Sequence, residues 1–170
     1  MTESFMVRVA VPADLPRLHP VIERAYRGDA ARQGWTHEAD LLSGERIDDA
    51  TLEAMLDDPS QTLLVAERGG VVAGCVSLNA RGDGLVYLGL LCVDPALQAA
   101  GIGKAIIAAA EQISRDALDA DRIEMTVIDS RIELIAYYER RGFVRTGERR
   151  PFPIPLDPPL DMVVLEKAIA

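Results

Sequence analysis

Segments of the chain that alternate apolar and polar side chains, or form short apolar runs, show the pattern of β-strands. They are Phe5 to Ala10, Thr62 to Glu67, Val71 to Asn79, Leu85 to Val93, Arg122 to Ile128, Phe143 to Glu148 and Met162 to Lys167. Arg68-Gly69-Gly70 separates the second and third of these segments and is typical of a hairpin turn. Gly82-Asp83-Gly84 turns the chain from the third segment into the fourth. The middle strands are therefore expected to form hairpins.

Other segments repeat apolar residues every three or four positions, which is the spacing of a helix with one buried face. They run from Asp14 to about Arg27, from Ala50 to Leu56, from Gly101 to about Leu118 and from Ile132 to Arg141. Asp14 is a suitable N-cap for the first helix and Gly28 a suitable end, whereas Pro20 predicts a kink or a later start. The irregular stretch from Gly34 to Gly44 fits either a loop or a short helix.

The order of these elements, β-α-α-β-β-β-α-β-α-β-β, predicts an α/β fold. We expect one domain over residues 1–170, with a mixed, mostly antiparallel central sheet of about seven strands and about four flanking helices. The hairpins in the middle argue against a doubly wound dinucleotide-binding fold, in which strands and helices alternate strictly.

Composition narrows the class of protein further. The net charge of −9, from 18 basic and 27 acidic residues, argues against binding to nucleic acid, which needs a basic surface. No stretch reaches the roughly 20 apolar residues of a membrane span, so a cytoplasmic protein is expected. Cys75, Cys92, His19 and His37 lack the spacing of a metal site, and no metal is expected.

The segment Gln98-Ala99-Ala100-Gly101-Ile102-Gly103-Lys104 lies where a predicted strand has ended and a helix begins. Glycines without side chains and the amides of a helix N-terminus form a good site for a phosphate or pyrophosphate. A dinucleotide fingerprint would need glycine in place of Ile106, and a P-loop would need Ser or Thr in place of Ala105. The simpler alternative is that the glycines only start the helix.

Three motifs in this order resemble the GNAT superfamily of N-acetyltransferases. Gln98-x-x-Gly101-x-Gly103 matches its (Gln/Arg)-x-x-Gly-x-(Gly/Ala) signature. Leu91-Cys92-Val93-Asp94-Pro95 is similar to the strand that leads into this signature, and Tyr138-Glu139-Arg140-Arg141-Gly142-Phe143 resembles the family's "YEKxGF" segment. The order of elements also resembles the family over almost the whole chain.

The resemblance implies acetyl-CoA as the cosubstrate. Backbone amides of the glycine turn would hold its pyrophosphate, and main-chain groups of the preceding strand would pair with its pantetheine arm, as an added strand does. The residues implied are Leu91, Cys92, Val93, Gln98, Ala99, Ala100, Gly101, Ile102, Gly103, Lys104 and Arg131. Arg131 lies near where many members carry asparagine, and it could reach the phosphates, reach the acceptor or lie in solvent.

The resemblance also implies a catalytic acid, Tyr138, which would protonate the departing thiolate. A phenol with a pKa near 10 is protonated at neutral pH and can donate. The alternative is a tyrosine of the core, because Leu134, Ile135 and Tyr138 share a helix face. Glu38 is the preferred general base, with His37 and Glu67 as other candidates. Glu38 could instead cap a short helix.

Acceptor-binding residues are expected in the loop after the first helix, which forms one wall of the acceptor cleft in the family. Tyr26 and Trp35 are the candidates there, although Trp35 could simply anchor the loop. Phe152 belongs to the proline-rich connection 151–159 and could add an apolar contact. Backbone amides near Cys92, in a bulged strand, are the expected oxyanion donors, and its thiol is expected to be inert.

The predicted function is N-acetylation of a primary amine by direct attack on acetyl-CoA in a ternary complex, with a small-molecule acceptor. The alternatives are acetylation of a protein N-terminus or lysine, or a non-catalytic acyl-CoA sensor that keeps the turn. Family members are often dimers, so a homodimer is a further possibility.

Overall fold

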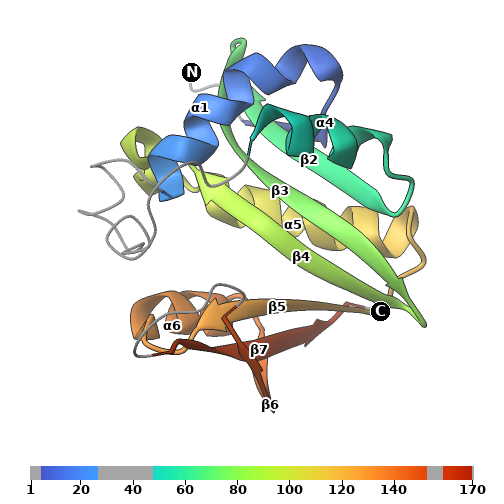
Figure 1. Ribbon diagram of the computed structural model, residues 1–170, viewed down its shortest axis with the longest axis vertical. Helices are drawn as coiled ribbons and strands as arrows, with labels where there is room; N and C mark the ends of the chain where they lie inside the picture. Colours follow the sequence, from blue (N-terminus) through green and yellow to red (C-terminus); the bar gives the residue numbers. More distant parts are fainter. Residues whose placement is uncertain (1–4, 27–47, 153–158, 170) are drawn as a thin grey trace.

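The computed structural model describes residues 5–26, 48–152 and 159–169, which build one seven-stranded sheet with helices on both faces (Figure 1). The strands are β1 (Met6–Val9), β2 (Gln61–Arg68), β3 (Val71–Gly82), β4 (Leu85–Val93), β5 (Arg122–Ile128), β6 (Val144–Pro151) and β7 (Asp161–Ala168). They lie in the order β1-β2-β3-β4-β5-β7-β6, and only the pair β4 and β5 is parallel. The predicted mixed, mostly antiparallel sheet is confirmed.

The described helices agree with the predicted ones to within a few residues. The α-helices are α1 (Leu15–Tyr26), α4 (Asp49–Asp57), α5 (Ile102–Asp116) and α6 (Ile132–Arg140), with short 3-10 helices η1 (Pro12–Asp14) and η2 (Pro95–Ala100). Helix α1 continues through Pro20, which lies inside it. Gly28 and the stretch from Gly34 to Gly44 lie outside the described residues. Within the part that is described, no helix combines the length and the apolar character needed to cross a membrane.

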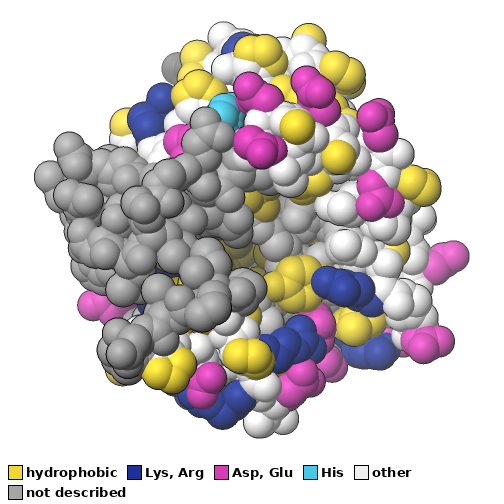
Figure 2. All heavy atoms as spheres, in the orientation of Figure 1, with side chains coloured by type: hydrophobic (Ala, Val, Ile, Leu, Met, Phe, Trp, Pro, Cys, Tyr) yellow, Lys and Arg dark blue, Asp and Glu magenta, His cyan; other side chains and the backbone are white. Residues whose placement is uncertain are grey.

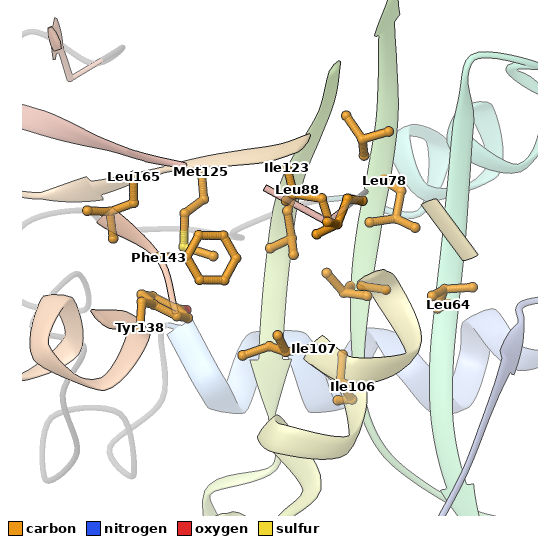
Figure 3. Close-up of a cluster of buried hydrophobic side chains, with 14 of the residues drawn as sticks. Leu64, Leu78, Leu88, Ile106, Ile107, Ile123, Met125, Tyr138, Phe143 and Leu165 are labelled. Carbon is orange, nitrogen blue, oxygen red and sulfur yellow. The ribbon is translucent and has the colours of Figure 1, made fainter. Parts of the chain in front are cut away.

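The sheet is covered on its two faces by different helix pairs (Figure 1). Helices α1 and α4 pack on one face, over a cluster that includes Leu18, Ile22, Leu52 and Leu63. Helices α5 and α6 pack on the other face over a larger core (Figure 3). Residues of that core are Leu64, Leu78, Leu88, Ile106, Ile107, Ile123, Met125, Tyr138, Phe143 and Leu165. The apolar faces of the helices, which repeat every 3.6 residues, thus pack on the apolar faces of the strands, which repeat every two residues. They form one core layer on each side of the sheet.

Asp14 does not cap α1, which corrects the sequence-based prediction. Its side chain is turned back, because its carboxylate accepts the N–H of Val11 at 2.7 Å and closes η1 instead. Both its oxygens also accept from the Arg8 guanidinium at 2.8 Å, and Arg17 donates at 2.9 Å. Asp14 is 0% exposed, so this buried carboxylate ties β1 to the start of α1.

Candidate functional site

The sheet is divided where β4 meets β5. The two strands pair over only three positions, from Leu85 and Arg122 to Tyr87 and Glu124. The hydroxyls of Tyr87 and Thr126 hydrogen-bond at 2.7 Å at the end of this ladder. Beyond it the strands diverge (Figure 1), and no described strand pairs with β4 on that side. This edge of β4 therefore offers main-chain N–H and C=O groups to a ligand.

A β-bulge lies in the diverging part of β4. Cys75 pairs with Cys92, but Ser77 pairs with Gly89, so β4 has one residue more than β3 over this stretch. Leu90, inside the bulge, has a φ of +50°, a left-handed conformation that leucine rarely adopts. The predicted bulge near Cys92 is thus present. A bulge re-aims main-chain groups of its strand.

Gly74 allows β3 and β4 to approach closely beside this bulge. A Cβ at this position would lie 2.4 Å from the carbonyl oxygen of Cys92 and 3.2 Å from the Cα of Val93. Both atoms are backbone, so they cannot rotate away. The end of β4 therefore keeps its course only while residue 74 has no side chain.

We expect Gly74→Ala to lower the free energy of unfolding by about 2 kcal/mol, because the strands must separate to admit the methyl group. Urea denaturation followed by circular dichroism measures this loss. Gly89→Ala is the matched control on the same strand pair, since its Cβ would meet only side-chain atoms of Ser77 and Tyr87, at 3.3 Å. A loss for Gly74→Ala no larger than that for Gly89→Ala would contradict the steric argument.

The turn after β4 begins at an aspartate whose side chain caps it and ends at a glycine with a left-handed backbone. The Asp94 carboxylate accepts the N–H of Ala96 at 3.1 Å and pairs with Arg24 of α1 at 2.7 Å. The 3-10 helix η2 then leads to Gly101, whose φ of +77° joins it to α5. Among the described residues, no atom would lie within 4 Å of a Cβ on Gly101, so none of them fills the space at that position.

The first turn of α5 carries the backbone amides that the sequence predicts to bind an anion. The amides of Ile102, Gly103 and Lys104 are first-turn amides of the helix, which have no partner within an α-helix. Lys104 is exposed. For Gln98, Ala99 and Ala100 only the backbone is described, as part of η2. The predicted phosphate-binding segment thus consists of three consecutive elements, which are the end of a strand, a 3-10 turn and the N-terminus of a helix.

Helix α6 borders this turn through Tyr137. A Cβ on Gly103 would lie 3.0 Å from the Tyr137 hydroxyl and 3.7 Å from a Val93 methyl, so the three residues are packed together. The guanidinium of Arg141 lies 5.0 Å from the centre of the Tyr137 ring. The sequence motif drew attention to Tyr138, whereas the contact between the turn and α6 is made by its neighbour.

Tyr138, on the same helix, faces the core and is 7% exposed. Its ring makes edge contacts with Tyr137 and Phe143, at centroid distances of 5.5 and 6.1 Å (Figure 3). Burial raises the pKa of its phenol, and the charge of Arg131, the residue that precedes α6, acts in the opposite direction. Tyr138 is therefore protonated at neutral pH. The contacts fit both alternatives, the catalytic acid and the core tyrosine.

The predicted acceptor and base residues are only partly described. Trp35, His37 and Glu38 lie outside the described residues, and of Tyr26 only the backbone at the end of α1 is described. Phe152 follows β6, and its N–H donates to the carbonyl of Leu160 at 3.0 Å.

The alternative base Glu67 lies away from the gap. Its strand, β2, is separated from β5 by β3 and β4. The carboxylate is paired with Arg8 at 2.9 Å, which lowers its pKa. A carboxylate held in this way is a poor general base, and Glu67 is not brought to the site.

The sequence-based prediction missed a polar group on the face of the sheet opposite α5 and α6. Because Ile123 and Met125 face the core, Glu124 and Thr126 face the other way, beside Tyr87. Glu124 is 8% exposed, and its carboxylate accepts from the Arg150 guanidinium at 3.1 and 3.3 Å. Figure 2 shows basic and acidic side chains interspersed on the lower part of this face, below a hollow.

The comparison with protein families agrees with this geometry. The model of the acetyltransferase (GNAT) family matches residues 23–143, which include α4, the strands β2 to β5, the glycine turn and α6. The chain belongs to the GNAT family of acetyltransferases.

Individual relatives are similar to different extents. Mycothiol acetyltransferase of Salinispora tropica is 32% identical over 141 residues, a match that covers 72% of this chain and 44% of that protein. The chain thus spans less than half the length of this relative. The ribosomal-protein-S18-alanine N-acetyltransferase of Escherichia coli has the same fold, with a TM-score of 0.75, 17% identity and coverage of 98% and 95% of the two chains. YncA of Salmonella typhimurium, solved with its cofactor acetyl-CoA, has a TM-score of 0.74, 18% identity and coverage of 99% and 95%.

Proposed function

We propose that this protein transfers the acetyl group of acetyl-CoA to a primary amine, by direct attack in a ternary complex. The observation that carries the proposal is the continuity of the open β4 edge, its bulge at Leu90 and the Gly101 turn at the N-terminus of α5. A ligand with two amide groups in an extended arm and a pyrophosphate at its end matches this sequence of features. Acetyl-CoA is such a ligand.

The described residues fit this cosubstrate. The main chain of Leu91, Cys92 and Val93 would pair with the pantetheine amides along the open edge. The amides of the first turn of α5 and the side chain of Lys104 would hold the pyrophosphate, since a helix N-terminus favours anions. The space at the Cβ position of Gly101, which no described residue fills, leaves room for phosphate oxygens. Acetyl-CoA, when bound, supplies the thioester whose acetyl group is transferred.

The catalytic roles follow from the needs of amide formation. Main-chain N–H groups near Cys92, directed by the bulge, would stabilise the oxyanion. Tyr138, whose pKa is raised by burial, holds the proton that the leaving sulfur needs. Glu38 is the proposed base that accepts the proton of the amine. Arg131, whose charge acts on Tyr138, is proposed as a further cosubstrate-binding residue.

We further propose a small molecule as the acceptor. The relative with the higher sequence identity carries the name of mycothiol, and this supports a small acceptor over a protein. Tyr26, Trp35 and Phe152 are the proposed acceptor contacts. The pair of buried Glu124 and half-buried Arg150 beside the gap would add charged groups to this side of the site.

The experiment that tests the proposal measures thiol release from acetyl-CoA against a panel of small amines, lysine-containing peptides and peptides with free N-termini. We expect CoA release with at least one small amine, matched mole for mole by the N-acetylated product. Turnover on peptides alone would move the acceptor to proteins. Tight CoA binding with no turnover on any amine would leave an acyl-CoA sensor.

We expect Gly101→Ala to raise the KM for acetyl-CoA about tenfold, because an L-residue at a φ of +77° costs roughly 1–2 kcal/mol and the turn relaxes away from the amides that bind phosphate. Gly70→Ala is the matched control. Its φ is +81°, no described atom would lie within 4 Å of its Cβ either, and it lies in the hairpin between β2 and β3. The control should lose similar stability with an unchanged KM. Equal KM values in the two variants would remove the turn from cosubstrate binding.

A further inference from the structure

The chain has two cysteines, and the fold brings them into contact across neighbouring strands. Cys75 of β3 and Cys92 of β4 are direct partners in the antiparallel ladder, and their sulfurs are 3.5 Å apart. Both are free thiols. They lie on the sheet face covered by α1 and α4, where Cys75 is fully buried and Cys92 is 5% exposed.

The backbone geometry at this pair suits a covalent bond. Directly opposed residues of antiparallel strands have Cα atoms about 4.5 or 5.5 Å apart, depending on the type of pair. Both values lie within the range of about 4.4–6.8 Å that disulfides span. The sulfurs already point at each other, so a bond needs only a small rotation of the side chains.

The thiols are also connected to the bulge. Cys75 Sγ donates to the carbonyl oxygen of Leu90 at 3.4 Å. Leu90 is the bulge residue with a φ of +50°, and this hydrogen bond helps to hold a conformation that costs a leucine energy. If Cys75 donates to Leu90, the Cys92 thiol is the donor between the two sulfurs. The state of the thiols and the conformation of the bulge are therefore coupled.

We propose that Cys75 and Cys92 form a reversible redox site, in which hydrogen peroxide oxidises the two thiols to a disulfide that links β3 and β4. The Cys92 sulfur, the more exposed of the two, attacks the peroxide; the O–O bond breaks, and a sulfenic acid and one water form. The Cys75 sulfur then displaces the sulfenic oxygen as a second water, and the S–S bond forms. The two sulfurs give up two electrons to the peroxide, and both thiol protons end in water.

Oxidation removes the donor that Leu90 has in the reduced protein and draws Cys92 toward β3. The residues on either side of Cys92 are those whose main chain is proposed to pair with pantetheine, so this second part rests on the proposed function. We expect the disulfide to weaken CoA binding about fivefold, the effect of losing one ordinary hydrogen bond.

Intact mass spectrometry after treatment of the reduced protein with hydrogen peroxide tests the site, without any need for activity. The expected result is the loss of two hydrogens, the disappearance of both free thiols, a linked Cys75–Cys92 peptide after digestion, and full reversal by dithiothreitol. Added oxygen atoms, a covalent dimer on a non-reducing gel, or two thiols that persist would each overturn the proposal. The test uses the wild-type chain, so no variant has to fold.

Cys75→Ala and Cys92→Ala serve as controls, because with one thiol left an internal disulfide cannot form. Cys75→Ala should gain oxygen at Cys92 and lose no hydrogen under the same treatment. Cys92→Ala, which keeps only the fully buried thiol, should gain no oxygen at Cys75. Calorimetry with CoA then compares the reduced and oxidised wild-type protein. An unchanged Kd would overturn the coupling to the bulge and leave the disulfide standing. Failure of the reduced protein to bind CoA would overturn the proposed function and leave the redox site standing.

Discussion

Tyr138→Phe is expected to lower kcat about 100-fold, while the KM for acetyl-CoA changes by no more than about threefold. Phenylalanine keeps the edge contacts with Tyr137 and Phe143, so the core stays packed and only the proton donor is lost. Steady-state kinetics with the amine found in the thiol-release assay measures the effect. Thermal unfolding of the same variant should be nearly unchanged.

Tyr137→Phe is the matched control for this prediction. It removes a hydroxyl one residue away, beside Gly103 and not in the core, and kcat should stay within about threefold of the wild-type value. Full kcat in Tyr138→Phe would make Tyr138 a residue of the core alone. Because burial raises the pKa of Tyr138, its deprotonation should add no falling limb to the kcat profile below pH 10.

Asp14→Asn is expected to lower the free energy of unfolding by about 3 kcal/mol at pH 7. The variant leaves the partly exposed Arg8 and Arg17 beside a buried amide in place of a buried carboxylate, and each hydrogen bond lost to a charged group costs about 1.5–3 kcal/mol. Glu67→Gln is the control, since it removes a partner of the same Arg8 at a more exposed position. Its cost should be clearly smaller than that of Asp14→Asn, because an exposed ion pair contributes little.

The effect of Asp14 has a defined pH dependence. Hydrogen bonds from Arg8 hold the pKa of Asp14 at about 2, below the ordinary value of 3.8. A carboxylate with a lowered pKa stabilises the folded state above its unfolded pKa, and this contribution is lost as the pH falls from about 4 to 2. Urea titrations at pH 7, 5 and below 4 should therefore show a constant difference between wild type and variant that shrinks only in the last step. A difference that persists undiminished at the lowest pH would contradict this origin.

Local patterns predicted the helices and strands well, because the repeat of apolar residues and the residue types of turns depend on neighbouring residues alone. Strand β5 has the predicted bounds, Arg122 to Ile128, and the Gly69-Gly70 hairpin lies where expected. The insertion of β7 between β5 and β6 was not predictable in this way, since strand order depends on which distant faces pack together.

The site was predictable where a motif marks it and not where tertiary contacts create it. The turn at Gly101 was predictable because glycine adopts a left-handed backbone conformation without steric cost. The left-handed backbone of Leu90 was not predictable, because leucine rarely adopts this conformation. It arises from the register between β3 and β4. The roles of Gly74 and Tyr137 depend on contacts with residues distant in sequence, and a pattern of neighbouring residues does not predict such contacts.

The short ladder between β4 and β5 also divides the chain into two contiguous parts. Strands β1 to β4 pair with one another before the ladder, α5 packs on them, and β5, β7 and β6 pair among themselves after it. The pairs β2–β3, β3–β4 and β6–β7 join segments that are near in sequence, and only three residue pairs close the boundary. We expect each part to gain its hairpins early in folding and the boundary to form late, because only three residue pairs offset the entropy of closing the loop between β4 and β5. The gap proposed to receive the pantetheine arm would then lie on the boundary between two cooperative units, where local opening costs the least free energy.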